Sequence, residues 1–209
     1  MCGFDSHPRH HRMVPKPISQ DRALRAYILG LALGDGGLSN PNGRAQRLRI
    51  SCDTRYPQLV SRIAESIKLL LPQNRVSFVK HSGKNCVDVS CYSNHWEELL
   101  GWRAGKGSKR EQRVSVPRWI FEEDSYKTAC LKGLLETDGT IYSDRGYRMG
   151  MFCTTTPELA TDVDELIWSL GFFPRTCKIN RNSPCHTTYH VRLSKRVMEF
   201  LSLVKPDKS

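Results

Sequence analysis

The hydrophobic positions along the chain follow two periods, one typical of helices and the other typical of strands. In residues 26–39, AYILGLALGDGGLS, an apolar helical pattern continues through two glycines and ends at an aspartate. Glycine inside a helix costs about 1 kcal/mol relative to alanine, and an acid in the last turn meets the negative end of the helix dipole. Both features therefore need an explanation.

A second copy of this pattern supplies the first explanation. Residues 128–143, TACLKGLLETDGTIYS, place Gly133 and Asp138 103 positions after Gly30 and Asp35. Small residues recur at every fourth position in both copies: Ala26, Gly30 and Gly34 in the first, and Ala129, Gly133 and Thr137 in the second. Because a four-residue spacing lies along one helix face, we predict that the two helices pack in parallel through these flat faces.

Alternating residues predict strands after each of these helices. In residues 46–53 the apolar positions are expected to face inward and the others outward: Leu48, Ile50 and Cys52 inward, Arg47, Arg49 and Ser51 outward. At the offset of 103, the second copy gives GMFCT, residues 150–154. The same parity predicts Met151 and Cys153 inward, with Gly150, Phe152 and Thr154 outward.

The remaining pattern completes the two copies. Amphipathic helices are predicted at 56–71 and 157–172, further strands at 75–81, 86–92, 175–180 and 188–194, and short helices at 95–102 and 195–204. We therefore predict an α+β fold of two pseudo-symmetric αββαββα repeats with antiparallel sheets. The expected parts are an arm at 1–20, a first repeat at 21–101, a basic linker at 102–124 and a second repeat at 125–209. Gly36 and Gly139, directly after the aspartates, are expected to end the helices in the left-handed conformation.

Composition adds a partner class to this picture. Lys and Arg number 32 against 21 Asp and Glu, giving a formal net charge of +11. Such an excess favours a polyanionic partner, most commonly nucleic acid. Within the linker, the segment RAGKGSKREQRVSVPRW, residues 103–119, concentrates this charge in Arg103, Lys106, Lys109, Arg110, Arg113 and Arg118, against the single acid Glu111.

The cysteines and the apolar runs indicate a compartment. None of the eight cysteines forms a CxxC pair, and several occupy apolar positions, so we expect reduced thiols in an intracellular protein. Potential zinc ligands exist in the second repeat, but their spacing matches no common zinc motif: Cys177, Cys185, His186 and His190. No apolar run approaches the roughly 20 residues of a membrane span, so no membrane partner is expected.

The paired aspartates explain the second feature of the opening segment. If the two helices pack in parallel, Asp35 and Asp138 end side by side at one pole, where their charges and the helix dipoles repel. A divalent cation would relieve this repulsion. Oxygen ligands and a phosphate-bearing partner favour Mg²⁺, which supports phosphodiester cleavage.

These residues also resemble a known family. The segments YILGLALGDG and CLKGLLETDG resemble the two signature helices of the LAGLIDADG homing endonucleases. The segment VPRWIF before the second signature and LIWSLGFFPR at the end of the following helix match the family pattern as well. The resemblance extends from about residue 21 to residue 205 and is to the single-chain type with two repeats.

The resemblance implies a function. Members of the family cleave both strands of a long DNA site, pseudo-palindromic or asymmetric, leaving staggered 3′ ends, and they act in intron homing. The implied catalytic and metal-binding residues are Asp35 and Asp138, with backbone carbonyls at Gly34 and Thr137 as further ligands. The implied cofactor is Mg²⁺, for which Mn²⁺ substitutes, whereas Ca²⁺ binds without supporting cleavage. The chain is expected to act as a monomer on double-stranded DNA, in whichever compartment holds the host gene.

Basic residues near the metals are implied too. The matching places are the GKGSK run in the linker and the VKPDK run near the end of the chain. Lys106 is the first expectation in the linker, Lys109 the second, and Lys205 the counterpart in the second half. Such a lysine polarises the scissile phosphate or lowers the pKa of the attacking water.

Outward-facing strand residues are the candidates for DNA contact, because arginines and polar side chains suit guanine edges and phosphates. The set comprises Arg47, Arg49, Ser51, Lys80, Ser90, Tyr92, Lys109, Arg148, Thr154, Lys178, His190 and Arg192. Two alternatives remain open at this stage: an intron RNA maturase, and a DNA-binding protein of the same fold without catalysis.

Overall fold

The computed structural model describes residues 18–180 and 187–207. The first repeat comprises α1 (Arg22–Leu33), β1 (Gly36–Ser39), β2 (Gln46–Asp53), α2 (Pro57–Leu70), β3 (Val76–Lys80), β4 (Cys86–Ser93) and α3 (Trp96–Leu100). A 3₁₀ helix, η1 (Arg118–Glu122), precedes the second, which comprises α4 (Asp124–Thr137), β5 (Gly139–Asp144), β6 (Tyr147–Thr154), α5 (Pro157–Ser169), β7 (Arg175–Ile179), β8 (Thr188–Leu193) and α6 (Val197–Val204). The predicted α+β fold with two αββαββα repeats is confirmed.

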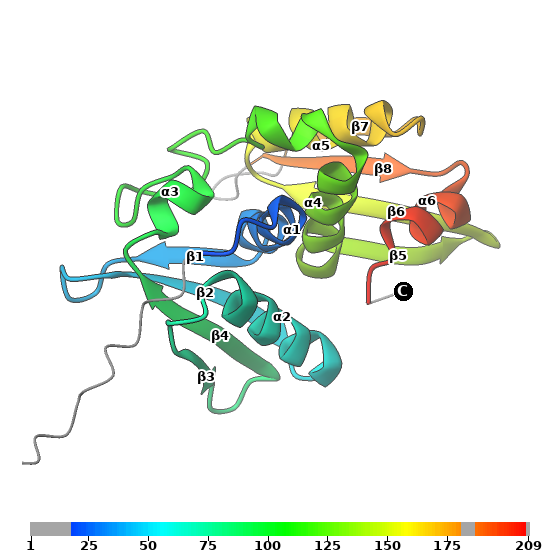
Figure 1. The fold of residues 1–209 in the computed structure, drawn as a ribbon. Coiled ribbons are helices and arrows are strands. Elements are labelled where there is room, and N and C mark those ends of the chain that lie inside the picture. The colour runs from blue at the N-terminus through cyan, green and yellow to red at the C-terminus, as the bar shows by residue number, and fades with distance from the viewer. Residues whose placement is uncertain (1–17, 181–186, 208–209) are drawn as a thin grey trace, which may run out of the picture.

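Each repeat folds its four strands into one antiparallel sheet. The strand orders are β1-β2-β4-β3 and β5-β6-β8-β7, so the two sheets have the same topology. Figure 1 shows α1 and α4 side by side at the centre of the molecule, with one sheet on either side. Helix α2 packs on β3 and β4, and α5 packs on β6 and β8. The helices thus cover one face of each sheet.

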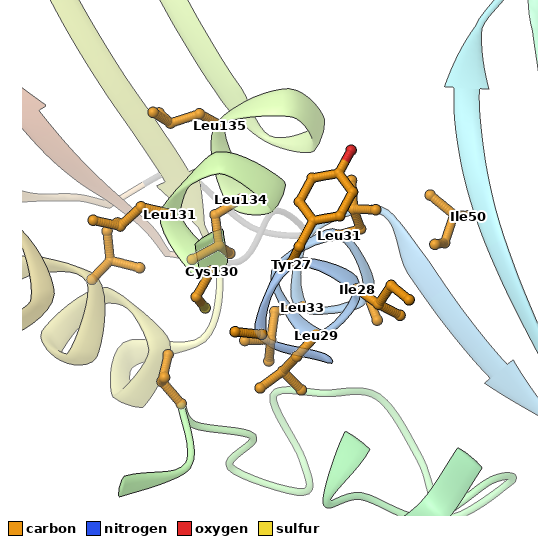
Figure 2. Packing of buried hydrophobic residues seen from close by; sticks show 14 of the residues in the cluster. Tyr27, Ile28, Leu29, Leu31, Leu33, Ile50, Cys130, Leu131, Leu134 and Leu135 are labelled. Carbon is orange, nitrogen blue, oxygen red and sulfur yellow. The ribbon is translucent and has the colours of Figure 1, made fainter. Parts of the chain in front are cut away.

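The central helices approach so closely because glycines line their interface. A side chain at Gly30 would collide with the backbone carbonyl of Cys130, and one at Gly133 with the backbone of Tyr27 and Leu31. One turn further on, a side chain at Gly34 would collide with Thr137. The successive matches run in the same direction along both helices, so the predicted parallel packing is correct. Figure 2 shows the apolar residues around this contact.

Gly36 and Gly139 have a different role from the one expected. Neither has a positive φ, and each is the first residue of a strand, β1 and β5 respectively. A Cβ atom at Gly36 would collide with the backbone of Ala32, and one at Gly139 with the backbone of Leu135. The prediction of left-handed helix caps was therefore wrong. Glycine is needed here because the strand turns back closely against its own helix.

The strand register of the second repeat also differs from the expectation. Gly36 pairs with Ile50 in the first sheet, whereas Gly139 pairs with Phe152 in the second. The helices therefore repeat at 103 residues but the second strands at 102, because the second hairpin has one residue fewer between its first glycine and the residue paired with it. A one-residue shift moves every side chain to the other face.

This shift reverses the predicted parity of β6. Phe152 is 2% exposed and belongs to the core, opposite Val191. Met151 and Cys153, which we expected inward, pair with Arg192 and His190 on the face away from the helices. The first repeat matches its prediction, since Leu48, Ile50 and Cys52 are all buried. These positions and the apolar faces of α2 and α5 form one continuous core.

The linker between the repeats contributes to that core. Trp102, Val114 and Val116 are buried, and the backbone N–H of Val116 donates to Asp162 Oδ2 on α5 at 2.6 Å. Burial raises the pKa of Asp162, although this hydrogen bond acts in the opposite direction. The linker is thus a packed segment whose basic residues have defined places.

The remaining expectations concern thiols and membranes. None of the six cysteines within the described residues forms a disulfide, and Cys52, Cys91 and Cys130 are buried as small apolar side chains. Burial raises the pKa of the Cys91 thiol to about 11. Across residues 18–180 and 187–207, no helix has the length and apolar character needed to cross a membrane. Most of the expected arm, residues 1–17, lies outside the described residues.

Candidate metal centre and nucleic-acid interface

The two aspartates lie at the same pole of the central helix pair. Asp35 follows α1 and is exposed, and Asp138 caps the C-terminus of α4 and is half-buried. The Cβ position of Gly34 would be 3.4 Å from Asp138 Oδ2. The carboxylate from α4 therefore lies directly beside the end of α1, as the parallel packing requires.

Lys109 reaches this pole from the linker. Its Nζ donates to the carbonyl oxygens of Ala32 at 3.0 Å and of Leu33 at 2.7 Å, and also to that of Gly34. These are the unpaired carbonyls at the C-terminus of α1, where the helix dipole favours a cation. Lys109 is consequently part of the acidic pole.

The electrostatics of Lys109 reflect this position. Burial lowers the pKa of Lys109 to about 8, while the carboxylates of Asp138 and Asp35 act to raise it. The lysine remains largely protonated at neutral pH and offsets part of the negative charge. Lys109 and Asp138 both line an open pocket of about 410 Å³. Lys109 and the Asp138 carboxylate thus face the same open space, whereas Asp35 does not line it.

The structure changes the order of the lysine candidates. Lys106, our first expectation, is exposed in the loop before Lys109. Lys205 caps α6, and its backbone carbonyl accepts a hydrogen bond from Lys132 at 2.5 Å. Neither residue lines the pocket at Asp138. Lys109, which we had placed second and among the DNA contacts, is the lysine that the structure brings to the aspartates.

The oxygen donors at this pole fit a hard divalent cation. Two carboxylates at the negative ends of two helices are the donor type that Mg²⁺ prefers. Of the two implied carbonyl ligands, that of Gly34 is hydrogen-bonded to Lys109. The Thr137 hydroxyl donates to the carbonyls of Gly133 and Leu134 in its own helix, and its own carbonyl stays a predicted ligand. Asp35 and Asp138 thus remain the predicted central donors.

The first sheet presents most of its candidate DNA contacts on one face. Arg47 pairs with Tyr92 and Arg49 with Ser90, in alternation with the buried Leu48 and Ile50, so these side chains lie opposite the helices. Ser51 continues this face. The guanidinium of Arg47 lies 5.9 Å from the centre of the Tyr92 ring.

Lys80 does not belong to this face. Lys80 pairs with Val87, whose side chain is buried on the helix side of the sheet. Paired residues of antiparallel strands share a face, so Lys80 points toward the side that α2 covers. The expectation that Lys80 lies on the outward face with the other candidates was wrong for this reason.

The second sheet requires more corrections. His190 and Arg192 lie on the face away from the helices, as predicted. Lys178 pairs with Tyr189, which packs against the core, and so lies on the helix side. Arg148 shares the parity of Phe152 and lies on that side too. Thr154 has the same parity, but at the end of β6 it lines the pocket at Asp138.

One basic residue on the open face was missed. Arg175 pairs directly with Arg192, so both guanidinium groups extend from the same face. All five residues of its strand, β7, are exposed, so neither face of the strand is marked by a row of buried apolar residues. The sequence therefore carried no signal for which side chains share a face. Of the potential zinc ligands in this repeat, Cys177 and His190 are direct register partners, and Cys185 and His186 lie outside the described residues.

Comparison with known proteins supports the family resemblance. Residues 125–201 match the family model of the LAGLIDADG-like domain. The match covers α4, with its signature and Asp138, and most of the second repeat. A comparison with curated proteins finds no significant match.

Solved structures extend the LAGLIDADG fold to both repeats. The homing endonuclease I-DmoI in complex with DNA and Mn is 18% identical, with a TM-score of 0.65, covering 88% of this chain and 96% of that one. Mesophilic variants of I-DmoI are 17% identical, with a TM-score of 0.65, covering 88% of this chain and 95% of that one. The N-terminal LAGLIDADG domain of DUF199/WhiA is 13% identical, with a TM-score of 0.60, covering 90% of this chain and 86% of that one. At these identities the likeness establishes the two-repeat fold.

Proposed function

We propose that this protein is a divalent-metal-dependent endonuclease that hydrolyses both strands of duplex DNA at a specific site. The observation that carries the proposal is the shared pole of the central helices, where Asp35, Asp138 and Lys109 meet. Paired carboxylates beside a partly buried ammonium group provide both a cation site and a phosphate-binding charge. Such a combination suits phosphodiester hydrolysis.

The side chains at the pole have different roles in the proposed reaction. Asp35 and Asp138 hold the divalent cation through their carboxylate oxygens. When bound, the metal activates a water molecule and stabilises the leaving oxygen. Lys109 is anchored by the carbonyls at the end of α1, so its ammonium group is fixed next to the position of a scissile phosphate. Its charge stabilises the phosphorane-like transition state.

The open faces of the two sheets bind the DNA. Arg47 and Arg49 project from the first sheet, and Arg175 and Arg192 from the second. With a net charge of +11, the chain attracts the DNA backbone, and its affinity falls as the salt concentration rises. Because one chain carries both aspartates, we propose that the protein acts as a monomer.

Relatives of the same fold support this proposal. I-DmoI is named a homing endonuclease, and its structures include complexes with target DNA in the presence of Mg or Mn and a complex with DNA and Ca. We propose the corresponding cofactor use here: Mg²⁺ for cleavage, Mn²⁺ as a substitute, and Ca²⁺ for binding without cleavage.

A cleavage screen against a randomised duplex DNA library tests the function directly. With Mg²⁺ we expect double-strand breaks with staggered 3′ ends at one enriched sequence, and with Ca²⁺ binding without cleavage. Asp35→Asn and Asp138→Asn should each abolish cleavage. Glu65→Gln is the matched control, because Glu65 is an exposed acid on α2, away from the pole. Cleavage that persists in both aspartate variants would refute the proposal.

The same screen separates the alternatives. Tight binding to an RNA library without DNA cleavage would identify a maturase, and DNA enrichment without cleavage would identify a DNA-binding protein without catalysis. For the lysine, Lys109→Met should slow cleavage by about 10²-fold or more, as expected for loss of a transition-state charge. Lys106→Met is expected to cleave at nearly the normal rate.

A further inference from the structure

A group of metal-ligand side chains lies on the first sheet, outside the pole. His81 follows β3, Cys86 begins β4, and Asp88 is two residues further along β4. One ligand atom from each residue lies within 4.8 Å of the others. The backbone N–H of His81 donates to the Cys86 carbonyl at 3.3 Å, which holds the two ends of the turn together. The chain thus brings imidazole, thiol and carboxylate to one point.

All three groups lie on one face of the sheet. Asp88 pairs with Ser51, and Cys86 lies two residues away with the same parity, so both lie on the face opposite α2. Asp88 is almost fully buried, whereas the His81 imidazole is 37% exposed and Cys86 is half-buried. A cation can therefore enter from solvent and reach the carboxylate below.

The carboxylate of Asp88 is held in position for an ion. His81 Nε2 lies 3.0 Å from Asp88 Oδ2, and Ser51 Oγ donates to Oδ1 at 2.8 Å. The Arg49 guanidinium also approaches Asp88 Oδ2, but at 3.5 Å it lies farther from this oxygen than His81 does. Although burial raises the pKa of Asp88, the hydrogen bonds from Ser51 and His81 and the nearby positive charges lower it below its ordinary value. The group is anionic at neutral pH.

We propose that His81, Cys86 and Asp88 form a zinc-binding site. Tetrahedral zinc with bonds of about 2.0–2.3 Å needs ligand atoms about 3.3–3.6 Å apart, close to the observed separation of His81 and Asp88. The Cys86 thiol lies within 4.8 Å of the other two ligand atoms, so it reaches this separation with a shift of about 1.5 Å or less through rotation of its side chain. A nitrogen, a sulfur and one oxygen form a zinc-type donor set rather than a magnesium-type one. Water completes the coordination.

Zinc binding at this site changes the charges around Arg49. Zn²⁺ replaces the thiol proton of Cys86, which passes to solvent, and takes the Asp88 oxygen that now lies near Arg49. The Arg49 guanidinium is then released toward the open face of the sheet. The zinc site itself does not depend on the proposed nuclease function, because it concerns metal binding by the protein alone.

Cobalt substitution tests the site in the full-length reduced protein. We expect one equivalent of Co²⁺ to produce thiolate-to-cobalt absorption and tetrahedral visible bands, and Zn²⁺ to displace them. Cys86→Ser should remove the thiolate band, and His81→Ala should weaken Zn²⁺ binding by at least about tenfold. His95→Ala is the matched control for His81→Ala, because His95 is an exposed histidine that precedes α3, beyond the other end of β4.

Circular dichroism of each variant checks that it remains folded, and a second variant, Asp88→Asn, tests the carboxylate without removing volume. The site is disproved if the wild-type protein gives no thiolate–cobalt band, or if Cys86→Ser retains it unchanged. Loss of DNA cleavage in the Asp35 and Asp138 variants, measured separately, leaves this result unaffected. The two proposals therefore fail independently.

Discussion

At the scale of single residues, Lys109 shows how burial and charge compete at the acidic pole. Burial lowers its pKa from the ordinary 10.5 to about 8, while Asp138 and Asp35 counteract the shift. Between about pH 8 and pH 10.5, Lys109 binds more protons in the unfolded chain than in the folded chain. The contribution of Lys109 to stability therefore increases as the pH rises from about 8 to about 10.5.

The aspartates should control this titration. Asp35→Asn and Asp138→Asn each remove a negative charge that raises the pKa of Lys109, so its midpoint should fall below about 8 in both variants. The measurement is an NMR titration of the lysine side chain with ¹³Cε labelling. Glu65→Gln, which removes an acid elsewhere, should leave the midpoint in place. A midpoint near 10.5 in the wild-type protein would contradict the burial of the ammonium group.

The residues of the pole were only partly predictable from sequence. Asp35 and Asp138 follow from the duplicated pattern, because helix periodicity fixes which residues share an end. The choice between Lys106 and Lys109 depends on the path of the linker. That path is set by the buried Trp102 and by the contact of Val116 with α5, and neither produces a periodic signal.

At the scale of elements, the hairpins decide which side chains face the open side of each sheet. The first repeat follows its alternating pattern, and every inward prediction for β2 was confirmed. In the second repeat the shorter connection shifts β6 by one residue relative to the helices. Because Met151, Phe152 and Cys153 are all apolar or nearly so, alternation within β6 could not reveal the shift. The neighbouring Val191 and Leu193, both buried, settle the register.

The register makes a direct prediction about DNA affinity. Arg49→Ala and Arg175→Ala remove guanidinium groups from the open faces and should weaken binding to duplex DNA and reduce its salt dependence. Lys80→Ala and Lys178→Ala remove the same charge from the helix side of the edge strands β3 and β7, so they should have a smaller effect. Fluorescence anisotropy at several salt concentrations measures both. Equal losses in all four variants would mean that charge matters and the face does not.

The helix interface makes a prediction about stability. Gly30→Ala and Gly133→Ala place a methyl group against backbone atoms of the facing helix, which cannot move without separating α1 from α4. We expect each to lower the free energy of unfolding by about 3 kcal/mol, the upper part of the range for overpacking. Gly150→Ala is the control, since its Cβ would meet no atom within 4 Å. Urea denaturation gives the comparison, and a loss below about 1 kcal/mol at Gly30 would contradict the close packing.

At the scale of the whole molecule, the last described residues join the two repeats. Asp207 pairs with Arg62 of α2 at 2.6 Å, and its backbone N–H donates to Glu136 of α4 at 2.9 Å. Glu136 is buried and also accepts a hydrogen bond from Tyr27 of α1 at 2.6 Å, and it pairs with Lys132 at 2.9 Å. Burial and this carboxylate raise the pKa of the Tyr27 hydroxyl. One acid thus connects both central helices to the end of the chain.

Removing this acid should destabilise the whole protein. Glu136→Ala leaves Lys132 and the Tyr27 hydroxyl without their buried partner, and we expect a loss of about 3–5 kcal/mol. Glu165→Ala breaks an ion pair with Arg118 that is half exposed and should cost less than about 1 kcal/mol. Thermal and urea unfolding measure the difference. Similar values for the two variants would show that the buried network contributes little to joining the repeats.

The one-residue difference between the hairpins makes the two halves chemically unequal. Where the first sheet offers arginines and serine to the outside, the corresponding strand of the second offers Met151 and Cys153, with the imidazole of His190 beside them. Guanidinium groups suit guanine, whereas thioether and thiol groups suit the methyl group of thymine. A duplex that satisfies both surfaces would have a left and a right arm of different base composition, so its preferred sequence would lack inverted-repeat symmetry despite the duplicated architecture of the protein.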